Sequence, residues 1–172
     1  MSARRVLIAY ATKHGTMAEV AEVIADELRS LDFQVDVQRV EEAADVTWYD
    51  AVIVGSALYM TRWRGEAVDF LRRHRGALSQ RPVWLFHGGP LSTDPASFEQ
   101  HLPDGVRVIA DRIGVRGHVT VGGRLMPGTP GFVEGLMLRG GTSGDFVNPE
   151  AIRIWARAIA AELDGLLVGA PA

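Results

Sequence analysis

Residues 6–19 read VLIAYATKHGTMAE, and this stretch decides the fold. An apolar strand runs through a short turn that carries hydroxyls, cations and a glycine, and then enters an amphipathic helix directly. Backbone N–H groups at the start of a helix lack partners within the helix, and the helix dipole adds partial positive charge there. The junction therefore predicts a binding place for a phosphate group.

The composition predicts one globular domain over residues 1–172, because 47% of the residues are hydrophobic and 23% are charged. A net charge of −3 gives no reason to expect nucleic acid, so a small-molecule partner fits better. The absence of cysteine excludes disulfides and iron–sulfur clusters, so redox chemistry requires a bound cofactor. The apolar run at residues 6–11 is far shorter than the ~20 residues of a transmembrane segment, and we expect a cytoplasmic protein without a metal site.

Strand-like and helix-like segments alternate along the chain. Strands are predicted at residues 4–10, 33–40, 51–56, 83–87 and 118–121, and helices from residue 17, from residue 65, over 106–113 and from residue 149. This alternation is typical of an α/β fold, in which helices cover both faces of a parallel sheet.

The strand patterns indicate which strands are central. The strands at residues 6–9, 51–54 and 83–86 are continuous apolar runs, whereas those at 33–38 and 118–121 alternate. Strands buried on both faces read as continuous runs, so the second and fifth strands are predicted at the edges. This favours a doubly wound sheet of five parallel strands in the order 2-1-3-4-5, with a ligand bound where the winding reverses between strands one and three.

Two of the predicted helices have recognisable capping residues in the sequence. The first is predicted to begin with a capping box, in which Thr16 and Glu19 satisfy the first backbone N–H groups. Its apolar stripe consists of Met17, Val20, Ala21, Ile24, Leu28 and Leu31. The last helix is predicted to have Asn148 as its N-cap and Pro149 at its first position. Residues 124–145 are rich in glycine and proline and are interpreted as an insertion before this helix.

Three loops follow the predicted strands, and the first offers groups suited to a phosphate. Thr12 and Thr16 bring hydroxyls, Gly15 permits a close backbone approach, and Lys13 and His14 bring positive charge or donors. The residues also allow a purely structural interpretation, in which Thr16 caps the helix and the cations are solvated.

The second loop, after the third strand, offers contacts for a flat ring. Ala57 and Leu58 follow small residues, so a ring could pass close to the backbone, and Tyr59 and Trp63 could stack on it. The alternative is that both aromatics cover the start of the next helix.

The third loop, after the fourth strand, contains His87, Gly88 and Gly89. Adjacent glycines expose backbone groups that could bond the edge of a heterocycle, although a plain turn is an equal alternative. His87 could donate to such a ligand or serve a structural role.

Together these loops resemble those of the flavodoxin superfamily, above all residues 10–16 and 54–59. The resemblance implies that they hold the phosphate, the inner ring face, and the outer face with the pyrimidine edge of FMN. The cofactor-binding residues implied in this way are Thr12, Lys13, His14, Gly15, Thr16, Met17, Ala57, Leu58, Tyr59, Trp63, His87, Gly88 and Gly89.

Within this superfamily the chain is most similar to the branch that contains menaquinone-dependent protoporphyrinogen dehydrogenase. Trp63, residues 84–91 and residues 144–146 carry this resemblance, and an insertion follows the last strand in that branch too. The resemblance implies an FMN-dependent oxidoreductase or electron-transfer protein, in which flavin N5 is the reacting atom and the protein supplies no catalytic side chain. Electrons could pass from a reduced substrate such as protoporphyrinogen to a quinone.

One difference from the superfamily's usual sequence leaves a second class of function open. The superfamily usually ends its phosphate loop with threonine where this chain has Met17, so a hydroxyl contact is missing and Thr16 would have to compensate. The alternative is a flavodoxin-fold binding or regulatory module with weak or lost flavin binding.

The insertion carries an apolar cluster of Phe132, Val133, Leu136, Met137 and Leu138. It could receive a quinone or porphyrin, contact a membrane surface peripherally, or pack on its own domain.

Overall fold

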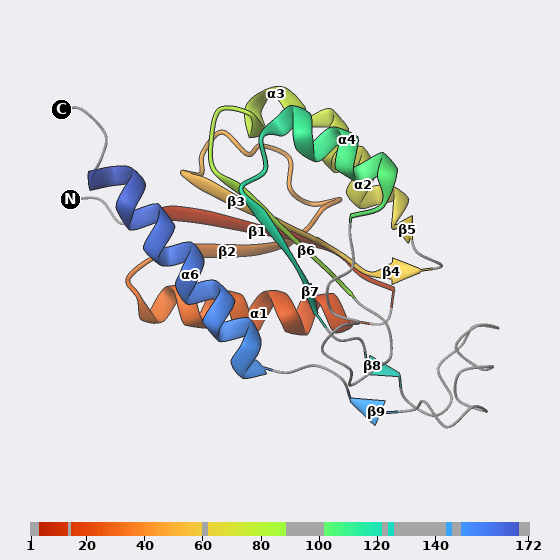
Figure 1. Ribbon diagram of the computed structural model, residues 1–172, viewed down its shortest axis with the longest axis horizontal. Helices are drawn as coiled ribbons and strands as arrows, with labels where there is room; N and C mark the ends of the chain where they lie inside the picture. The colour runs from red at the N-terminus through yellow and green to blue at the C-terminus, as the bar shows by residue number, and fades with distance from the viewer. Residues whose placement is uncertain are drawn as a thin grey trace.

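Five parallel strands form the central sheet in the computed structural model (Figure 1). The structure describes residues 4–13, 15–59, 62–88, 102–121, 124–125, 144–145 and 149–168. The sheet consists of β1 (Arg5–Ala11), β2 (Gln34–Arg39), β3 (Ala51–Ser56), β6 (Val83–Gly88) and β7 (Gly117–Val121). Their spatial order is β2-β1-β3-β6-β7, which confirms the predicted order 2-1-3-4-5 with the alternating strands at the edges.

Helices cover both faces of this sheet (Figure 1). α1 (Thr16–Ser30) and α6 (Pro149–Val168) lie on one face, whereas α2 (Gly65–Arg73), α3 (Arg75–Leu78) and α4 (Asp104–Ile113) lie on the other. Alternate residues of each central strand enter two separate cores, so Ile8 packs with α1 and α6 and Leu7 packs with α2 and α4. Every residue of β3 and β6 is buried, which explains their unbroken apolar sequences.

Two short antiparallel ribbons lie outside the main sheet. β4 (Leu58–Tyr59) pairs with β5 (Arg62–Trp63), and β8 (Arg124–Leu125) pairs with β9 (Gly144–Asp145). The second ribbon joins the two ends of the segment interpreted as an insertion, because Arg124 is paired with Asp145. The apolar cluster expected at residues 132–138 lies outside the described residues.

Two expectations for α1 were wrong. The N-cap is Gly15, in a left-handed conformation with φ 86°, and no side-chain hydrogen bond caps the helix, so the predicted capping box of Thr16 and Glu19 is not formed. Leu31 is 40% exposed because α1 ends at Ser30 and Leu31 is the C-cap in the turn that leads into β2. The rest of the predicted stripe, from Met17 to Leu28, is buried. Asn148, the predicted cap of α6, lies outside the described residues.

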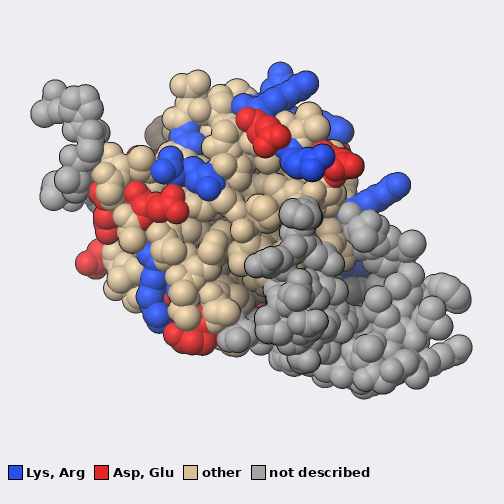
Figure 2. Space-filling view, viewed as in Figure 1, with Lys and Arg blue, Asp and Glu red and all other residues tan. Residues whose placement is uncertain are grey.

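The surface carries charges of both signs. Figure 2 shows Lys and Arg side chains interspersed with Asp and Glu over the described part of one face. Among the described residues, no helix combines the length and the apolar character that crossing a membrane requires.

Candidate functional site

The carboxyl ends of the central strands are aligned in one row. The strand register places Ala11 beside Ser56, Ser56 beside His87, and His87 beside Thr120. The residues that follow the first three members of this row, Thr12, Ala57 and Gly88, begin the three loops singled out in the sequence. The loops therefore leave the sheet at one edge, on both sides of the point where the winding reverses.

The first loop is a tight turn that opens α1. The Gly15 backbone N–H donates to Thr12 Oγ1 at 3.0 Å, so the Thr12 hydroxyl fixes the turn from within. Gly15 has a positive φ, and a Cβ added there would meet no described atom within 4 Å. The turn thus presents open space beside the first N–H groups of a 15-residue helix.

The second and third loops meet the first turn of α1 at Gly88. A Cβ built on Gly88 would lie 3.5 Å from Met17 Cε, 3.6 Å from the Leu58 backbone nitrogen and 4.0 Å from Ala57 Cα. The first two loops are also joined directly, because the Ala57 N–H donates to the Ala11 carbonyl at 2.9 Å. The second and third loops and the start of α1 thus lie together at the carboxyl edge of the sheet.

Met17 belongs to the core rather than to the loop surface. Its side chain is 1% exposed and packs in the cluster on the α1 and α6 face. A phosphate at this turn can therefore meet only the backbone N–H of Met17. The thioether therefore fills the interior and offers no polar contact at the turn.

Trp63 and His87 also point into the protein. The Trp63 indole is 5% exposed and packs in the cluster beneath α2, and its Nε1–H donates to His87 Nδ1 at 3.0 Å. His87 Nε2 lies 2.8 Å from Thr120 Oγ1. These two sequence-selected residues contact each other, and neither presents a face to solvent.

Ser56 holds the β4–β5 ribbon at its base. Its Oγ accepts from the Arg64 backbone N–H at 3.0 Å and donates to the Ala57 carbonyl at 2.8 Å. Ser56, His87 and Thr120 are the buried polar residues of the described chain, and all three belong to the row at the carboxyl edge. Buried polar groups are stable only where hydrogen bonds compensate for the loss of water. The gathering of three buried polar side chains at the carboxyl edge therefore distinguishes this edge from the rest of the described interior.

Charged side chains border the site. Lys13 is exposed in the first loop. Arg64 follows the ribbon and donates to Glu66 Oε1 at 2.9 Å. The pKa of Glu66 is lowered, chiefly by a hydrogen bond from its own backbone N–H and then by Arg64. Glu66 is therefore ionised over the ordinary pH range and offsets part of the positive charge of Arg64.

Sequence reasoning found part of this arrangement. Ala57, Leu58 and Gly88 lie together, and Thr12 and Gly15 are hydrogen-bonded to each other within the first loop, whereas His14 and Gly89 and the Tyr59 side chain lie outside the described residues. Thr16 is the first residue of α1. Ser56 and Thr120 were missed as site residues, although each is a hydroxyl residue at or near the end of an apolar strand. Among the described residues, no cluster of His, Asp or Glu could hold a metal ion.

Known proteins resemble this chain in sequence and in fold. Protoporphyrinogen IX dehydrogenase (quinone) of Escherichia coli strain K12 is 29% identical over 80 residues, covering 45% of this chain and 44% of that protein. The match thus spans less than half the length of this relative. Flavodoxin 2 of Bacillus cereus is 22% identical, with a TM-score of 0.61 over 92% of this chain and 99% of that one. A flavodoxin from the domain Archaea is 12% identical, with a TM-score of 0.65 over 93% of this chain and 99% of that one.

These solved structures show the fold, and the family follows from the sequence itself. The profile of the family described as "Flavodoxin domain" matches residues 7–124, which is more than half of the chain and includes all three loops. The chain therefore belongs to the flavodoxin domain family.

Proposed function

We propose that this chain binds FMN at the carboxyl edge of its sheet and acts as an FMN-dependent oxidoreductase or electron-transfer protein. The observation that carries the proposal is the meeting of the second and third loops with the first turn of α1, in which Met17, Ala57 and Leu58 all lie within 4.0 Å of a Cβ built on Gly88. Family membership adds the expectation of a flavin, and a cysteine-free chain needs such a cofactor for redox chemistry.

The phosphate would be held by the turn that opens α1. The helix start supplies backbone N–H groups and positive dipole charge, and Gly15 leaves open space beside them. Thr12 and Thr16 add hydroxyls, and Lys13 and His14 add charge or donors. Because Met17 is turned inward, its part is limited to a backbone N–H.

The ring would lie between the second and third loops. Ala57, Leu58 and Tyr59 would line one side, and the backbone of Gly88 and Gly89 would face its edge. When bound, FMN supplies reversible electron and hydride transfer at N5. Trp63 and His87 would contribute from beneath by holding the second loop in place.

The substrates are proposed from the relative's chemistry. The Escherichia coli protein is by name a protoporphyrinogen IX dehydrogenase that uses a quinone. For this chain we propose a reduced organic substrate, such as a porphyrinogen, as electron donor and a quinone as acceptor. The insertion at residues 124–145 is the proposed place for their apolar bodies, and a cytoplasmic location with peripheral membrane contact would suit a lipid-soluble quinone.

One observation favours the alternative, a flavodoxin-fold binding or regulatory module without tight flavin binding. Met17 buries a thioether where a threonine would add a phosphate contact. The loss of one charge-assisted hydrogen bond would weaken binding roughly tenfold to a hundredfold.

Titration of the purified protein with FMN, followed by flavin fluorescence and absorbance, tests the proposal. We expect a one-to-one complex that turns over menadione with protoporphyrinogen. Thr12→Ala should raise the dissociation constant about tenfold, because it removes a hydroxyl and the internal bond of the turn.

Thr47→Ala is the matched control. Thr47 is an exposed threonine that also closes a local turn, through Asp45, but it lies in the segment before β3, away from the carboxyl edge. Its affinity for FMN should equal that of the wild type. A wild-type protein that binds no FMN even at millimolar concentrations of the flavin would reject the proposal and favour the binding module.

A further inference from the structure

The hydrogen bonds around His87 define its protonation state. An indole N–H can only donate, so Trp63 Nε1 at 3.0 Å requires His87 Nδ1 to be an unprotonated acceptor. A neutral imidazole then carries its proton on Nε2, which donates to Thr120 Oγ1 at 2.8 Å. Thus the contacts select one tautomer out of the three protonation states of histidine.

The His87 imidazole connects three elements at the carboxyl edge of the sheet. His87 lies on β6, its Nδ1 partner Trp63 lies on β5, and its Nε2 partner Thr120 lies on β7. All the groups involved are buried, with His87 0% exposed. In such surroundings the hydrogen bonds are well screened from competing water.

The contact also places the second loop. Trp63 is paired with Leu58 across the β4–β5 ribbon, and the Leu58 nitrogen is 3.6 Å from a Cβ built on Gly88, the residue after His87. The ribbon is therefore fixed to the sheet at two points, at Ser56 through the Arg64 N–H and at His87 through the Trp63 indole. The first point holds the base of the ribbon, and the second holds its returning strand.

We propose that His87 is a positioning residue: as the neutral, Nε2-protonated tautomer it anchors the β4–β5 ribbon to the carboxyl edge and so sets the position of Leu58 and Tyr59 against the ligand. The imidazole acts through Trp63 and need not touch the ligand itself. The ligand part of this inference rests on the proposed FMN site, whereas the tautomer and the anchoring do not.

Nitrogen NMR of protein labelled at histidine tests the tautomer. The His87 signals are assigned as those that disappear in His87→Gln. We expect an unprotonated Nδ1 and a protonated Nε2 at neutral pH in the protein without ligand. An imidazolium, or a proton on Nδ1, would overturn the proposal.

Two substitutions at His87 test the anchor. In His87→Asn the amide oxygen can take the place of Nδ1 and accept from Trp63, whereas in His87→Gln the amide reaches toward Thr120 and the acceptor for Trp63 is lost. Hydrogen exchange of the ribbon amides should stay near the wild-type rate in the first variant and rise about tenfold in the second. Equal exchange in both variants would overturn the anchor.

Trp63→Phe keeps an aromatic ring but removes the donor, so the test survives if His87→Gln fails to fold. Ribbon exchange and the FMN dissociation constant should each rise about tenfold. Trp155→Phe is the matched control, because that indole packs edge-on against Phe86 on the opposite face of the sheet. Unchanged ribbon exchange in Trp63→Phe would refute the anchoring. A wild type that binds no FMN would instead refute the proposed function and leave the NMR and exchange results standing.

Discussion

At the scale of single residues, Tyr49 is a charge-sensitive contact far from the proposed site. Its hydroxyl donates to Asp36 Oδ2 at 2.8 Å, and burial, followed by this carboxylate, raises the pKa of Tyr49 to about 12. The folded state thus holds the phenol proton more tightly than the unfolded chain, in which the pKa is about 10. The stability from this group is complete below pH 10 and is lost as pH rises toward 12.

Tyr49→Phe should therefore cost about 1 kcal/mol at neutral pH, the usual worth of one such hydrogen bond. Its free energy of unfolding should also fall less steeply than that of the wild type between about pH 10 and about pH 12, the range between the unfolded and the folded pKa of Tyr49. Urea unfolding of both proteins across this range measures both effects. Parallel pH curves would show that the phenol proton is not held by the fold.

Single residues also show what the sequence could reveal. Thr12 and Gly15 were singled out because a hydroxyl and a glycine stand in a strand-to-helix turn, and the structure joins them there by a hydrogen bond. The capping box failed because Gly15 takes the N-cap position in a left-handed conformation, which the spacing of Thr16 and Glu19 does not encode. The inward direction of Trp63 depends on His87, 24 residues further along the chain, so no local pattern could predict it.

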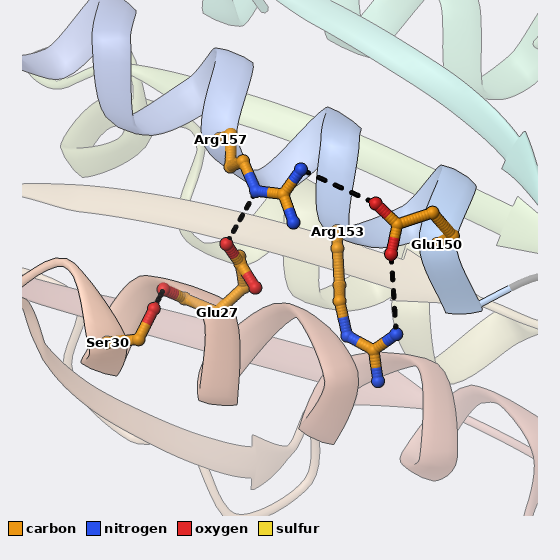
Figure 3. Close-up of polar contacts among 5 residues, drawn as sticks. All are labelled: Glu27, Ser30, Glu150, Arg153 and Arg157. Atoms are coloured by element: carbon orange, nitrogen blue, oxygen red, sulfur yellow. Dashed lines mark hydrogen bonds and ion pairs between the residues drawn. The ribbon is translucent and has the colours of Figure 1, made fainter.

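At the scale of elements, charged side chains join α1 to α6 (Figure 3). Arg157 Nε on α6 lies 2.7 Å from Glu27 Oε1 on α1, and Arg157 Nη1 lies 3.5 Å from Glu150 Oε1 two turns back along α6. Arg153 contacts only Glu150 among the residues drawn, at 3.7 Å within the same helix. Arg157 is thus the residue that links the two helices.

Arg157→Ala should lower the midpoint of thermal unfolding at low ionic strength, because it removes the interhelical pair along with the intrahelical one. The difference from the wild type should shrink in about 1 M salt, where screening acts over about 3 Å. Arg153→Ala is the matched control and should have a smaller effect, since it removes an exposed pair within one helix. Equal losses in the two variants, or a loss that salt does not change, would contradict an interhelical role.

The strands and helices differ in how well their local sequences predict them. Central and edge strands were told apart because burial on both faces leaves an unbroken apolar run and burial on one face leaves alternation. The helix at residues 104–113 was predicted two residues short at its start, because helix ends depend on contacts beyond the periodic residues. β4 and β5 escaped prediction because strands of two residues have no period to detect.

At the scale of the whole molecule, we ask whether the rest of the domain folds without the insertion. Leu125 and Gly144 are paired across the β8–β9 ribbon, so the chain on either side of residues 126–143 is already brought together. The described members of both hydrophobic cores all lie in parts of the chain outside this segment. Replacing residues 126–143 with Asn-Gly, a two-residue turn suited to antiparallel strands, should therefore preserve the fold.

Circular dichroism and thermal unfolding measure this prediction. We expect a cooperative transition within about 4 °C of the wild-type midpoint, which corresponds to about 1 kcal/mol for a domain of this size. FMN affinity should also be retained, because the three loops leave the sheet outside the deleted segment, whereas turnover of quinone should fall if residues 126–143 receive the substrate. A broad transition, or loss of FMN binding together with the fold, would mean that the segment is part of the core.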